Sequence, residues 1–329
     1  MFMGAKIIGM MGNARKPIEL NAKVGDNVLI VADTDTDPLV WQALAAAAHE
    51  FGAVPTVTIM TPRPAGQYDA PLPVIRAMQE SELNLLVPTK PLIHSPGAMA
   101  AQELGRKCIA MEEVTPDMLS KGAATADYFE MQKWGEKIRE IWTKGNHVRV
   151  TSELGTDLTA DITGRPGFYV AGRVNRQPGI TMYACAFPDG EAGVSPVEGT
   201  GEGVVVYDTT IHHVGLIQQP IRVVVKKGKA FRIEGGKEAK AIEQYIETHG
   251  DNEAYNFPAE ISIGINPKAR VTGLMREDKK LWGAVHIAFG TNSDTGGIVT
   301  SKLHIDGTIR YPTVVVDGRT IVEKGQIKI

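Results

Sequence analysis

DNVLIVAD at residues 26–33 and DPLVWQALAAAAHEFG at residues 37–52 decide the fold of the first half of this chain. The first stretch is a short apolar run, which is typical of a strand buried on both faces. The second begins with Asp and Pro and ends with Gly, the residues that favour the start and the end of a helix. A buried strand followed at once by a helix predicts a βα unit of a parallel sheet.

The same alternation continues to about residue 145. Further strands are expected at residues 54–60, 83–89 and 107–111, and further helices at residues 71–82, 94–105 and 127–145. This pattern predicts an α/β domain with a mostly parallel, doubly wound sheet over residues 1–146. The amphipathic helix at residues 127–145 is expected to lead out of that domain.

Beyond residue 146 the pattern changes to strands and turns. One helix is expected there, at residues 237–250, with Gly at its end. Two predicted hairpins resemble each other, because residues 220–228 and 312–318 both run from Pro through three consecutive Val residues to Gly. The sequence therefore predicts a β-rich (α+β) domain over residues 147–329, with an internal half-repeat.

Composition limits the classes of function. The chain has 329 residues, of which 43% are hydrophobic and 22% are charged, enough for two globular domains. A net charge of −3, with scattered Lys and Arg, argues against nucleic acid and acidic membranes as partners and favours a small-molecule substrate. The two cysteines, Cys108 and Cys185, form no CxxC motif, which argues against disulfides and thiolate zinc sites. The absence of a secretory or membrane-spanning apolar run predicts a cytoplasmic protein.

LHIDG at residues 303–307 suggests a metal site. It places His304 and Asp306 two residues apart in a predicted strand, so both side chains project from one face and could bind the same ion. The alternative is a buried histidine with a backbone partner and an Asp that opens a turn at Gly307. For this motif alone, the alternative is favoured.

Three other residues strengthen the metal hypothesis. Glu260 begins an apolar strand, where an unpaired carboxylate is costly, and His286 is flanked by apolar residues. Glu191 lies in a loop, with Glu198 and Glu202 close behind it. Each of them alone could be a solvated charge or a core histidine. Together with the HxD motif they form a set of carboxylates and imidazoles suited to zinc, cobalt, manganese or iron.

Five segments carry a resemblance to a known family: TDLTADITGRPG, FPDGEAGVSP, AEISIGINP, VHIAFG and LHIDG. In this order they resemble the motifs of the M29 metal-dependent aminopeptidases, of the aminopeptidase T type. The resemblance implies a bimetallic site and a homo-oligomer. The positions that match its ligands are Glu191, Glu260, His286, His304 and Asp306. The Tyr that those peptidases carry after the HIA-G motif has no counterpart in TNSDTGG at residues 291–297.

The chain also resembles the 2,5-dihydroxypyridine 5,6-dioxygenases of the same superfamily, which hold one Fe(II) ion with two His and one Asp. LIHSPG at residues 92–97 is similar to a segment of those enzymes in which a His acts as an acid/base group, and that position is His94 here. Glu260 stands where they have the first His ligand. A set of Glu, His and Asp is not the 2-His-1-carboxylate triad of non-haem iron enzymes.

These residues favour a metal-dependent hydrolase acting on a small amide, peptide or cyclic substrate, because a metal ion can activate water and polarise a carbonyl group. The predicted ligands of a Zn, Co or Mn ion are Glu260, His286, His304 and Asp306. Glu191 is expected to accept the proton of the water, and His94 to donate one to the leaving group. His94 could instead belong to the cap of a helix that starts at Ser95 and Pro96.

Two other functions stay open. The first is a non-haem Fe(II) ring-cleaving dioxygenase of the extradiol type. The second is a binding protein that keeps the scaffold without a metal.

Overall fold

A computed structural model describes residues 3–329 of the chain, which form two compact units. Of the described residues, the first unit comprises 3–126, Val170–Arg176 and Met182–Asp189, and the second comprises Asp127–Tyr169, Gln177–Thr181 and Gly190–Ile329. The helix that was expected at residues 127–145 falls in the second unit. The domain boundary between residues 146 and 147 stays a prediction.

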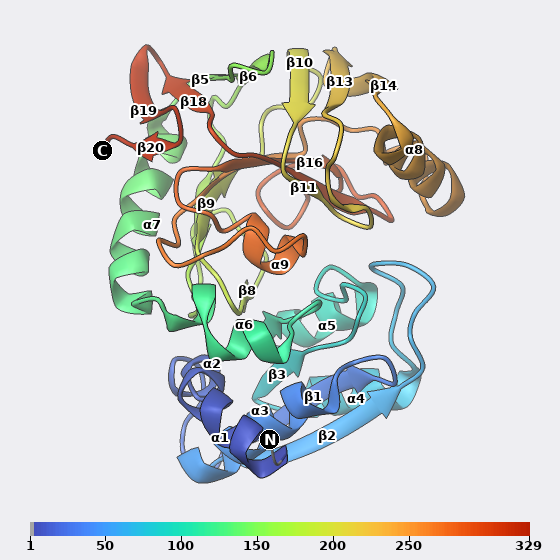
Figure 1. Cartoon of the computed structure of the whole chain (residues 1–329), viewed down its shortest axis with the longest axis vertical. Coiled ribbons are helices and arrows are strands. Elements are labelled where there is room, and N and C mark those ends of the chain that lie inside the picture. Colours follow the sequence, from blue (N-terminus) through green and yellow to red (C-terminus); the bar gives the residue numbers. More distant parts are fainter. Residues whose placement is uncertain (1–2) are drawn as a thin grey trace. The chain divides into compact units, whose positions relative to one another are not determined.

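The first unit is built on a five-stranded sheet with the strand order β2-β1-β3-β4-β8. Figure 1 labels its strands β1, β2, β3 and β8. Its strands are β1 (Asn27–Asp33), β2 (Val54–Met60), β3 (Leu83–Leu86), β4 (Lys107–Ala110) and β8 (Ala184–Ala186). All four pairs of neighbouring strands run parallel, which confirms the predicted α/β class. The sequence pattern did not indicate β8, a three-residue strand that lies far from the other four in the sequence.

The helices of this unit are α1 (Met3–Ala14), α2 (Lys16–Glu19), α3 (Pro38–Phe51), α4 (Leu72–Glu80), α5 (Pro96–Glu103), α6 (Pro116–Ser120) and the short 3-10 helix η1 (Gly122–Thr125). α3 begins as predicted, because the Asp37 carboxylate accepts a hydrogen bond from the backbone N–H of Leu39. It ends at Gly52, whose φ of 91° is in the left-handed region. α1 was not expected, because three glycines lower its helix propensity; buried Met10 and Ala14 stabilise it by packing.

The second unit contains two further sheets. The eight-stranded sheet, in spatial order, consists of β14 (Lys229–Glu234), β13 (Ile221–Lys226), β10 (Glu202–Tyr207), β6 (Asp157–Asp161), β5 (His147–Thr151), β18 (Thr313–Val316), β19 (Arg319–Glu323) and β20 (Gln326–Ile327). The seven-stranded sheet consists of β12 (Gly215–Leu216), β11 (Thr210–Ile211), β17 (His304–Ile309), β16 (Val285–Gly290), β15 (Glu260–Gly264), β9 (Glu191–Val194) and β7 (Gly167–Val170). Three helices accompany them: α7 (Tyr128–Lys144), α8 (Lys237–His249) and α9 (Met275–Asp278). This arrangement confirms the predicted β-rich (α+β) class.

The two hairpins with similar sequences also have similar turns. Lys227 and Gly228 connect β13 to β14 with φ values of 47° and 66°, and Asp317 and Gly318 connect β18 to β19 with φ values of 47° and 82°. Two successive positive φ values are typical of a type I′ turn. Each hairpin also shows a register shift inside its Val run. The two hairpins of the half-repeat are therefore similar in structure as well as in sequence.

The apolar face of the seven-stranded sheet explains the alternating isoleucines of the sequence. The fully buried side chains of this face include Ile261, Ile263, Ile287, Phe289 and Ile305. Because side chains alternate along a strand, the residues between them point to the opposite face. Among residues 3–329, no helix combines the length and the apolar character needed to cross a membrane.

Candidate metal centre

One face of the seven-stranded sheet carries a cluster of carboxylates and imidazoles. They come from four neighbouring strands, β9, β15, β16 and β17. We call the following five residues the carboxylate–imidazole cluster: Glu191, Glu260, His286, His304 and Asp306. Four of the five are buried and His304 is partly exposed. The structure thus brings together all the residues that the sequence proposed for this region.

The strand register makes room for these side chains. Glu260 and Asp306 both lie opposite Ala288 of the strand between them. Across the other pairs, His304 lies opposite Gly290, and Glu191 lies opposite a glycine of β15. Cross-strand neighbours stand only about 5 Å apart, so larger residues at these positions would fill the space that the charged groups occupy.

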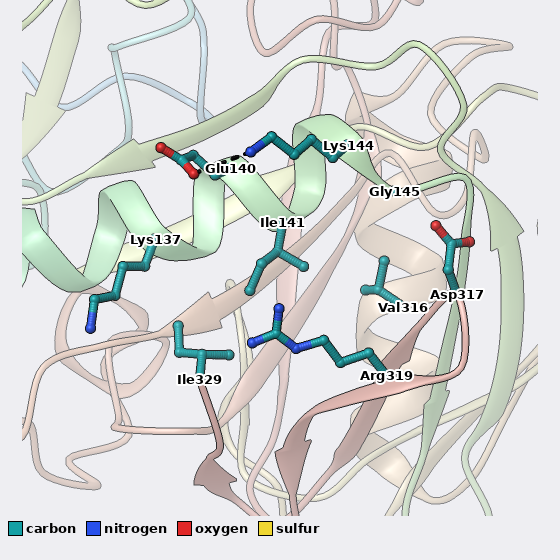
Figure 2. A pocket seen from close by; sticks show the side chains of 9 residues that line it. All are labelled: Lys137, Glu140, Ile141, Lys144, Gly145, Val316, Asp317, Arg319 and Ile329. Atoms are coloured by element: carbon teal, nitrogen blue, oxygen red, sulfur yellow. Dashed lines mark hydrogen bonds and ion pairs between the residues drawn. The ribbon is translucent and has the colours of Figure 1, made fainter.

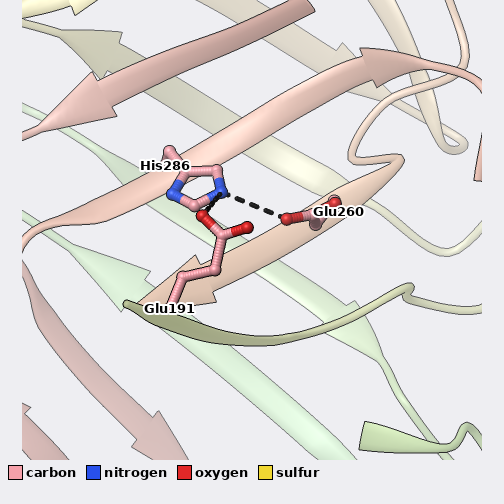
Figure 3. Close-up of side chains that lie close together, drawn as sticks. All are labelled: Glu191, Glu260 and His286. Carbon is pink, nitrogen blue, oxygen red and sulfur yellow. Dashed lines mark hydrogen bonds and ion pairs between the residues drawn. The ribbon is translucent and has the colours of Figure 1, made fainter. Parts of the chain in front are cut away.

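The five side chains approach one another closely. Nε2 of His286 lies 3.1 Å from Oε1 of Glu260 and 3.4 Å from Oε2 of Glu191 (Figure 3). Nε2 of His304 lies 3.6 Å from Oε2 of Glu260 and 3.2 Å from Oδ1 of Asp306. Each imidazole therefore stands between two carboxylates, and Glu260 contacts both imidazoles.

The hydrogen bond made by Nδ1 of His304 determines which ring nitrogen carries the hydrogen. Nδ1 lies 2.9 Å from the carbonyl oxygen of Thr291, which can only accept a hydrogen bond, so Nδ1 carries the hydrogen. In the neutral ring, Nε2 then presents a lone pair toward the carboxylate of Asp306. Two lone pairs at 3.2 Å need a cation between them, either a proton or a metal ion.

Two lysines that the sequence analysis did not single out complete the site. Nζ of Lys279 lies 2.8 Å from Oδ2 of Asp306 and 4.0 Å from Oε2 of Glu191. Nζ of Lys280 lies 2.6 Å from the same Glu191 oxygen. Their side chains are only 12% and 0% exposed. They belong to the run REDKK at residues 276–280, which by its charge reads as a solvated surface segment.

The charges of these neighbours shift the pKa values of the cluster. Burial alone would raise the pKa of Glu191, but the ammonium groups of Lys279 and Lys280 lower it to about 2. Burial likewise opposes ionisation of Asp306, yet Lys279 holds its pKa well below the usual range. For His304, burial disfavours the imidazolium, but the carboxylate of Asp306 outweighs it and raises the pKa to about 9. In the absence of an ion, a proton therefore takes the place between His304 and Asp306.

The donor set fits a divalent metal ion. Single ligand atoms of Glu191, Glu260 and His286 all lie within 4.8 Å of one another, close enough to share one ion. His304 and Asp306 are not in this group of three but lie beside it, since Nε2 of His304 is 3.6 Å from Oε2 of Glu260. The orientation of the His304 ring is fixed by a backbone carbonyl, a common arrangement for metal-binding histidines. A mixture of carboxylate oxygens and imidazole nitrogens suits zinc, manganese, cobalt or iron better than calcium.

His212 adds a further contact to the cluster. Its Nδ1 accepts a hydrogen bond of 3.0 Å from the backbone N–H of Asp306. Burial holds the pKa of His212 well below its usual value, so the ring is neutral and holds the strand at this position.

The other candidate glutamates have structural partners. Glu198 accepts hydrogen bonds from Asn292 and from the backbone N–H of Ile298, both at 2.9 Å, and it pairs with Arg165. It therefore fixes the loop at residues 291–298 and is not part of the cluster. Glu202 is exposed at the start of β10.

His94 belongs to the first unit. It precedes α5, and its backbone N–H donates a hydrogen bond of 2.9 Å to Oε1 of Gln67. Its neighbour Ser95 caps α5, as the sequence analysis predicted for the start of this helix. The role of His94 as an acid/base group stays a prediction.

One hollow on the surface of the second unit lies away from the carboxylate–imidazole cluster. It has a volume of about 450 Å³ (Figure 2). The residues that line it are Lys137, Glu140, Ile141, Lys144, Gly145, Val316, Asp317, Arg319 and Ile329. None of them belongs to the carboxylate–imidazole cluster, and no histidine is among them.

Comparisons with known proteins point to one family. The family model described as 2,5-dihydroxypyridine 5,6-dioxygenase matches residues 15–329. The 2,5-dihydroxypyridine 5,6-dioxygenase of Pseudomonas putida is 24% identical over 264 residues, which cover 77% of this chain and 72% of that protein. A solved structure of 2,5-dihydroxypyridine dioxygenase from Pseudomonas putida superposes with a TM-score of 0.81 at 20% identity, covering 97% of this chain and 96% of the other. AmpT from Thermus thermophilus superposes with a TM-score of 0.70 at 17% identity, covering 98% and 99% of the two chains.

The expectation of a metal-dependent hydrolase is wrong. The family model and the curated relative both carry the name of a dioxygenase, and the likeness to AmpT extends to the fold alone. The expectation rested on the carboxylate at position 260, which looked too anionic for an iron site. This one position was given too much weight. The structure places the imidazole of His286 3.1 Å from Glu260, so the carboxylate at position 260 stands beside an imidazole.

Proposed function

Because the chain belongs to the 2,5-dihydroxypyridine 5,6-dioxygenase family, we propose that it is a ring-cleaving dioxygenase acting on a small hydroxylated aromatic compound, of which 2,5-dihydroxypyridine is the first to test. The observation that carries this proposal is the pair His304 and Asp306. Their facing Nε2 and Oδ1 atoms, 3.2 Å apart, need a shared cation.

We infer that this cation is Fe(II). The cluster offers two imidazoles, His286 and His304, together with the carboxylates of Asp306 and Glu260. Two imidazoles and one carboxylate form the ligand set of many non-haem Fe(II) oxygenases, which leave further positions open for substrate and dioxygen. Glu260 contributes an additional oxygen donor, so this centre is more anionic than that ligand set alone.

Each residue would have a separate task. Glu260, His286, His304 and Asp306 would hold the ion, which supplies the place where dioxygen and the hydroxyl group of a substrate are brought together. His304 would keep its hydrogen on Nδ1, where the Thr291 carbonyl holds it. Glu191 is tied to the two lysines and has a pKa of about 2, which makes it a poor proton acceptor. His94 is therefore the better candidate for moving the substrate proton.

Oxygen uptake tests this function. The purified protein is stripped of metal, loaded anaerobically with Fe(II), and mixed with 2,5-dihydroxypyridine in air-saturated buffer. We expect uptake of one O₂ per substrate consumed, with loss of the pyridine absorbance. The zinc-loaded protein serves as the matched control, because Zn²⁺ has no redox chemistry. Substrate conversion at an equal rate without oxygen, or with zinc, would contradict the proposal.

Two expectations from the sequence stay predictions: assembly into a homo-oligomer and a cytoplasmic location. Light scattering on the purified chain measures the first. Fractionation of the cells that produce it measures the second.

A further inference from the structure

Another hollow of the second unit lies at the start of α8 and has a volume of about 530 Å³. We call it the α8 hollow. Its lining includes three residues that follow β11 and three residues of α8: His213, Val214, Leu216, Lys237, Glu238 and Ala241. All six lie outside the carboxylate–imidazole cluster, so the hollow needs an explanation of its own.

Glu238 is the residue of this hollow that the fold does not account for. It is only 4% exposed, and its Oε2 is buried without a hydrogen-bond partner among residues 3–329. Glutamates are almost never buried to this extent unless they are paired, because a carboxylate that leaves water without a donor or a cation is costly. A carboxylate of this kind in the wall of a hollow indicates that its partner comes from outside the chain.

The charges of the lining favour a cation as that partner. Lys237, the other charged residue of α8 in the lining, is exposed, so its ammonium is solvated and its field is screened by water and salt. The carboxylate of Glu238 is buried and is screened much less. The stronger attraction inside the hollow is therefore for positive charge.

The rest of the lining is suited to an organic group. Leu216 is 44% exposed although it is a large apolar residue, and Val214 and Ala241 add further apolar surface to the same hollow. Small-molecule sites typically combine such apolar surface with a few polar groups that orient the ligand. Burial of Leu216 under an apolar group would be favourable.

We propose that the α8 hollow binds a small organic molecule that carries a protonated amine on an apolar group, with the amine bound to the carboxylate of Glu238. The apolar group packs against Leu216, Val214 and Ala241. This inference does not depend on the proposed function, because it concerns neither the metal centre nor the reaction.

The wall formed by His213 is held in place before any ligand binds. Its backbone has a φ of 68°, a left-handed conformation that residues other than glycine rarely adopt. Its ring stacks on that of Tyr245 in α8, with 3.9 Å between the ring centroids and 14° between the planes. Tyr245 in turn packs against His249, with 4.7 Å between their centroids. A preformed wall lowers the entropy that a ligand must lose on binding.

NMR titration of the full chain with benzylamine and isobutylamine at neutral pH tests the proposal, with benzyl alcohol and isobutanol as uncharged counterparts. We expect saturable binding of at least one amine and weaker binding of its alcohol. Glu238→Gln should weaken amine binding by about tenfold or more, because a charge-assisted hydrogen bond is lost.

Three further variants locate the site. Glu247→Gln removes an exposed carboxylate from the same helix and should leave amine binding unchanged. Lys237→Met should bind the amines as tightly as the wild type or more tightly, because it removes a like charge. Ala241→Phe places a large side chain at an exposed position in the lining and should weaken binding by filling the hollow.

Any of four results would overturn the inference: no saturable binding of either amine, alcohols that bind as tightly as their amines, wild-type affinity in Glu238→Gln, or loss of binding in Lys237→Met. If the circular dichroism spectrum shows that Glu238→Gln does not fold, Ala241→Phe decides, and wild-type affinity in that variant counts against the α8 hollow. None of these measurements uses turnover, so the outcome is separate from that of the oxygen-uptake experiment.

Discussion

Nε2 of His304 and Oδ1 of Asp306 lie 3.2 Å apart on one face of β17, two residues along the same strand. Strand geometry places them on one face, and the hydrogen bond from Nδ1 of His304 to the Thr291 carbonyl turns the second nitrogen toward the carboxylate. The pair is therefore oriented before any ion arrives. This preorganisation leads to the first two predictions.

Replacing His304 by alanine should remove metal binding and leave the fold intact. We expect the affinity for Co²⁺ or Zn²⁺ to fall by at least about 100-fold, because even partners outside the ligand set often contribute 10–100-fold. Metal content after desalting and the circular dichroism spectrum measure the two effects. A variant that retains wild-type metal content would show that this imidazole is not a ligand.

Metal affinity should rise with pH up to about 9. The pKa of His304 is raised to about 9 in the metal-free protein, so the ring must lose a proton before it can bind an ion. Below that pH, each unit of acidification should weaken binding by about tenfold, as expected for one released proton. Competition titrations with a chelator of known affinity at several pH values measure this slope.

The stability of the metal-free protein should change in the opposite direction. The folded-state pKa of His304 is raised, so its contribution to stability is full below the unfolded-state value near 6.5 and is lost as the pH rises through about 9. Urea unfolding of metal-free wild type and His304→Ala across this range isolates the contribution. An equal pH dependence in both proteins would contradict the assignment.

Gly290 should not tolerate a side chain. Its φ is +92°, and an added Cβ would lie 2.1 Å from the backbone oxygen of Leu303. Gly290→Ala should therefore lower the free energy of unfolding by about 3 kcal/mol or more, from backbone strain and overpacking together. Gly318→Ala is the matched control, because its φ is +82° with open space around the added atom, and about 1 kcal/mol is expected there.

His94 should affect turnover and not metal content. If it moves the substrate proton, His94→Ala should lower kcat by about 10²–10⁴-fold, the usual contribution of a general acid or base. The bound metal per chain should stay at the wild-type value, since His94 is not among the proposed ligands. Steady-state oxygen uptake and metal analysis on the same sample separate the two roles.

Much of the fold could be predicted because the sequence repeats simple local patterns. The start and end of α3 follow from Asp37, Pro38 and Gly52, and the two similar hairpins follow from their Val runs and Gly turns. β8 escaped prediction, because a three-residue strand carries too little periodicity to be recognised. Its place in the first sheet depends on pairing with β4, a long-range contact that no local pattern encodes.

The site was partly predictable for the same reason. The family motifs indicated all five residues of the cluster, and four of them stand in strands that alternate with apolar residues. Glu191, which was expected in a loop, is the first residue of β9. Lys279 and Lys280 were missed, since a run of charged residues usually lies in solvent. Only the tertiary structure shows that Glu277 and Asp278 bind local donors and leave these lysines to face the cluster.

Small residues lie opposite the cluster, so the side chains of the cluster take little part in the packing of the apolar core. Ala288 and Gly290 stand across the strands from the donor side chains, while the isoleucines of the core occupy the other face. A donor can therefore be exchanged for one of similar size without disturbing the packing that holds the sheet together. We expect such an exchange at position 260. Proteins with this architecture can therefore differ in the metal ion that they bind while their stability stays nearly constant.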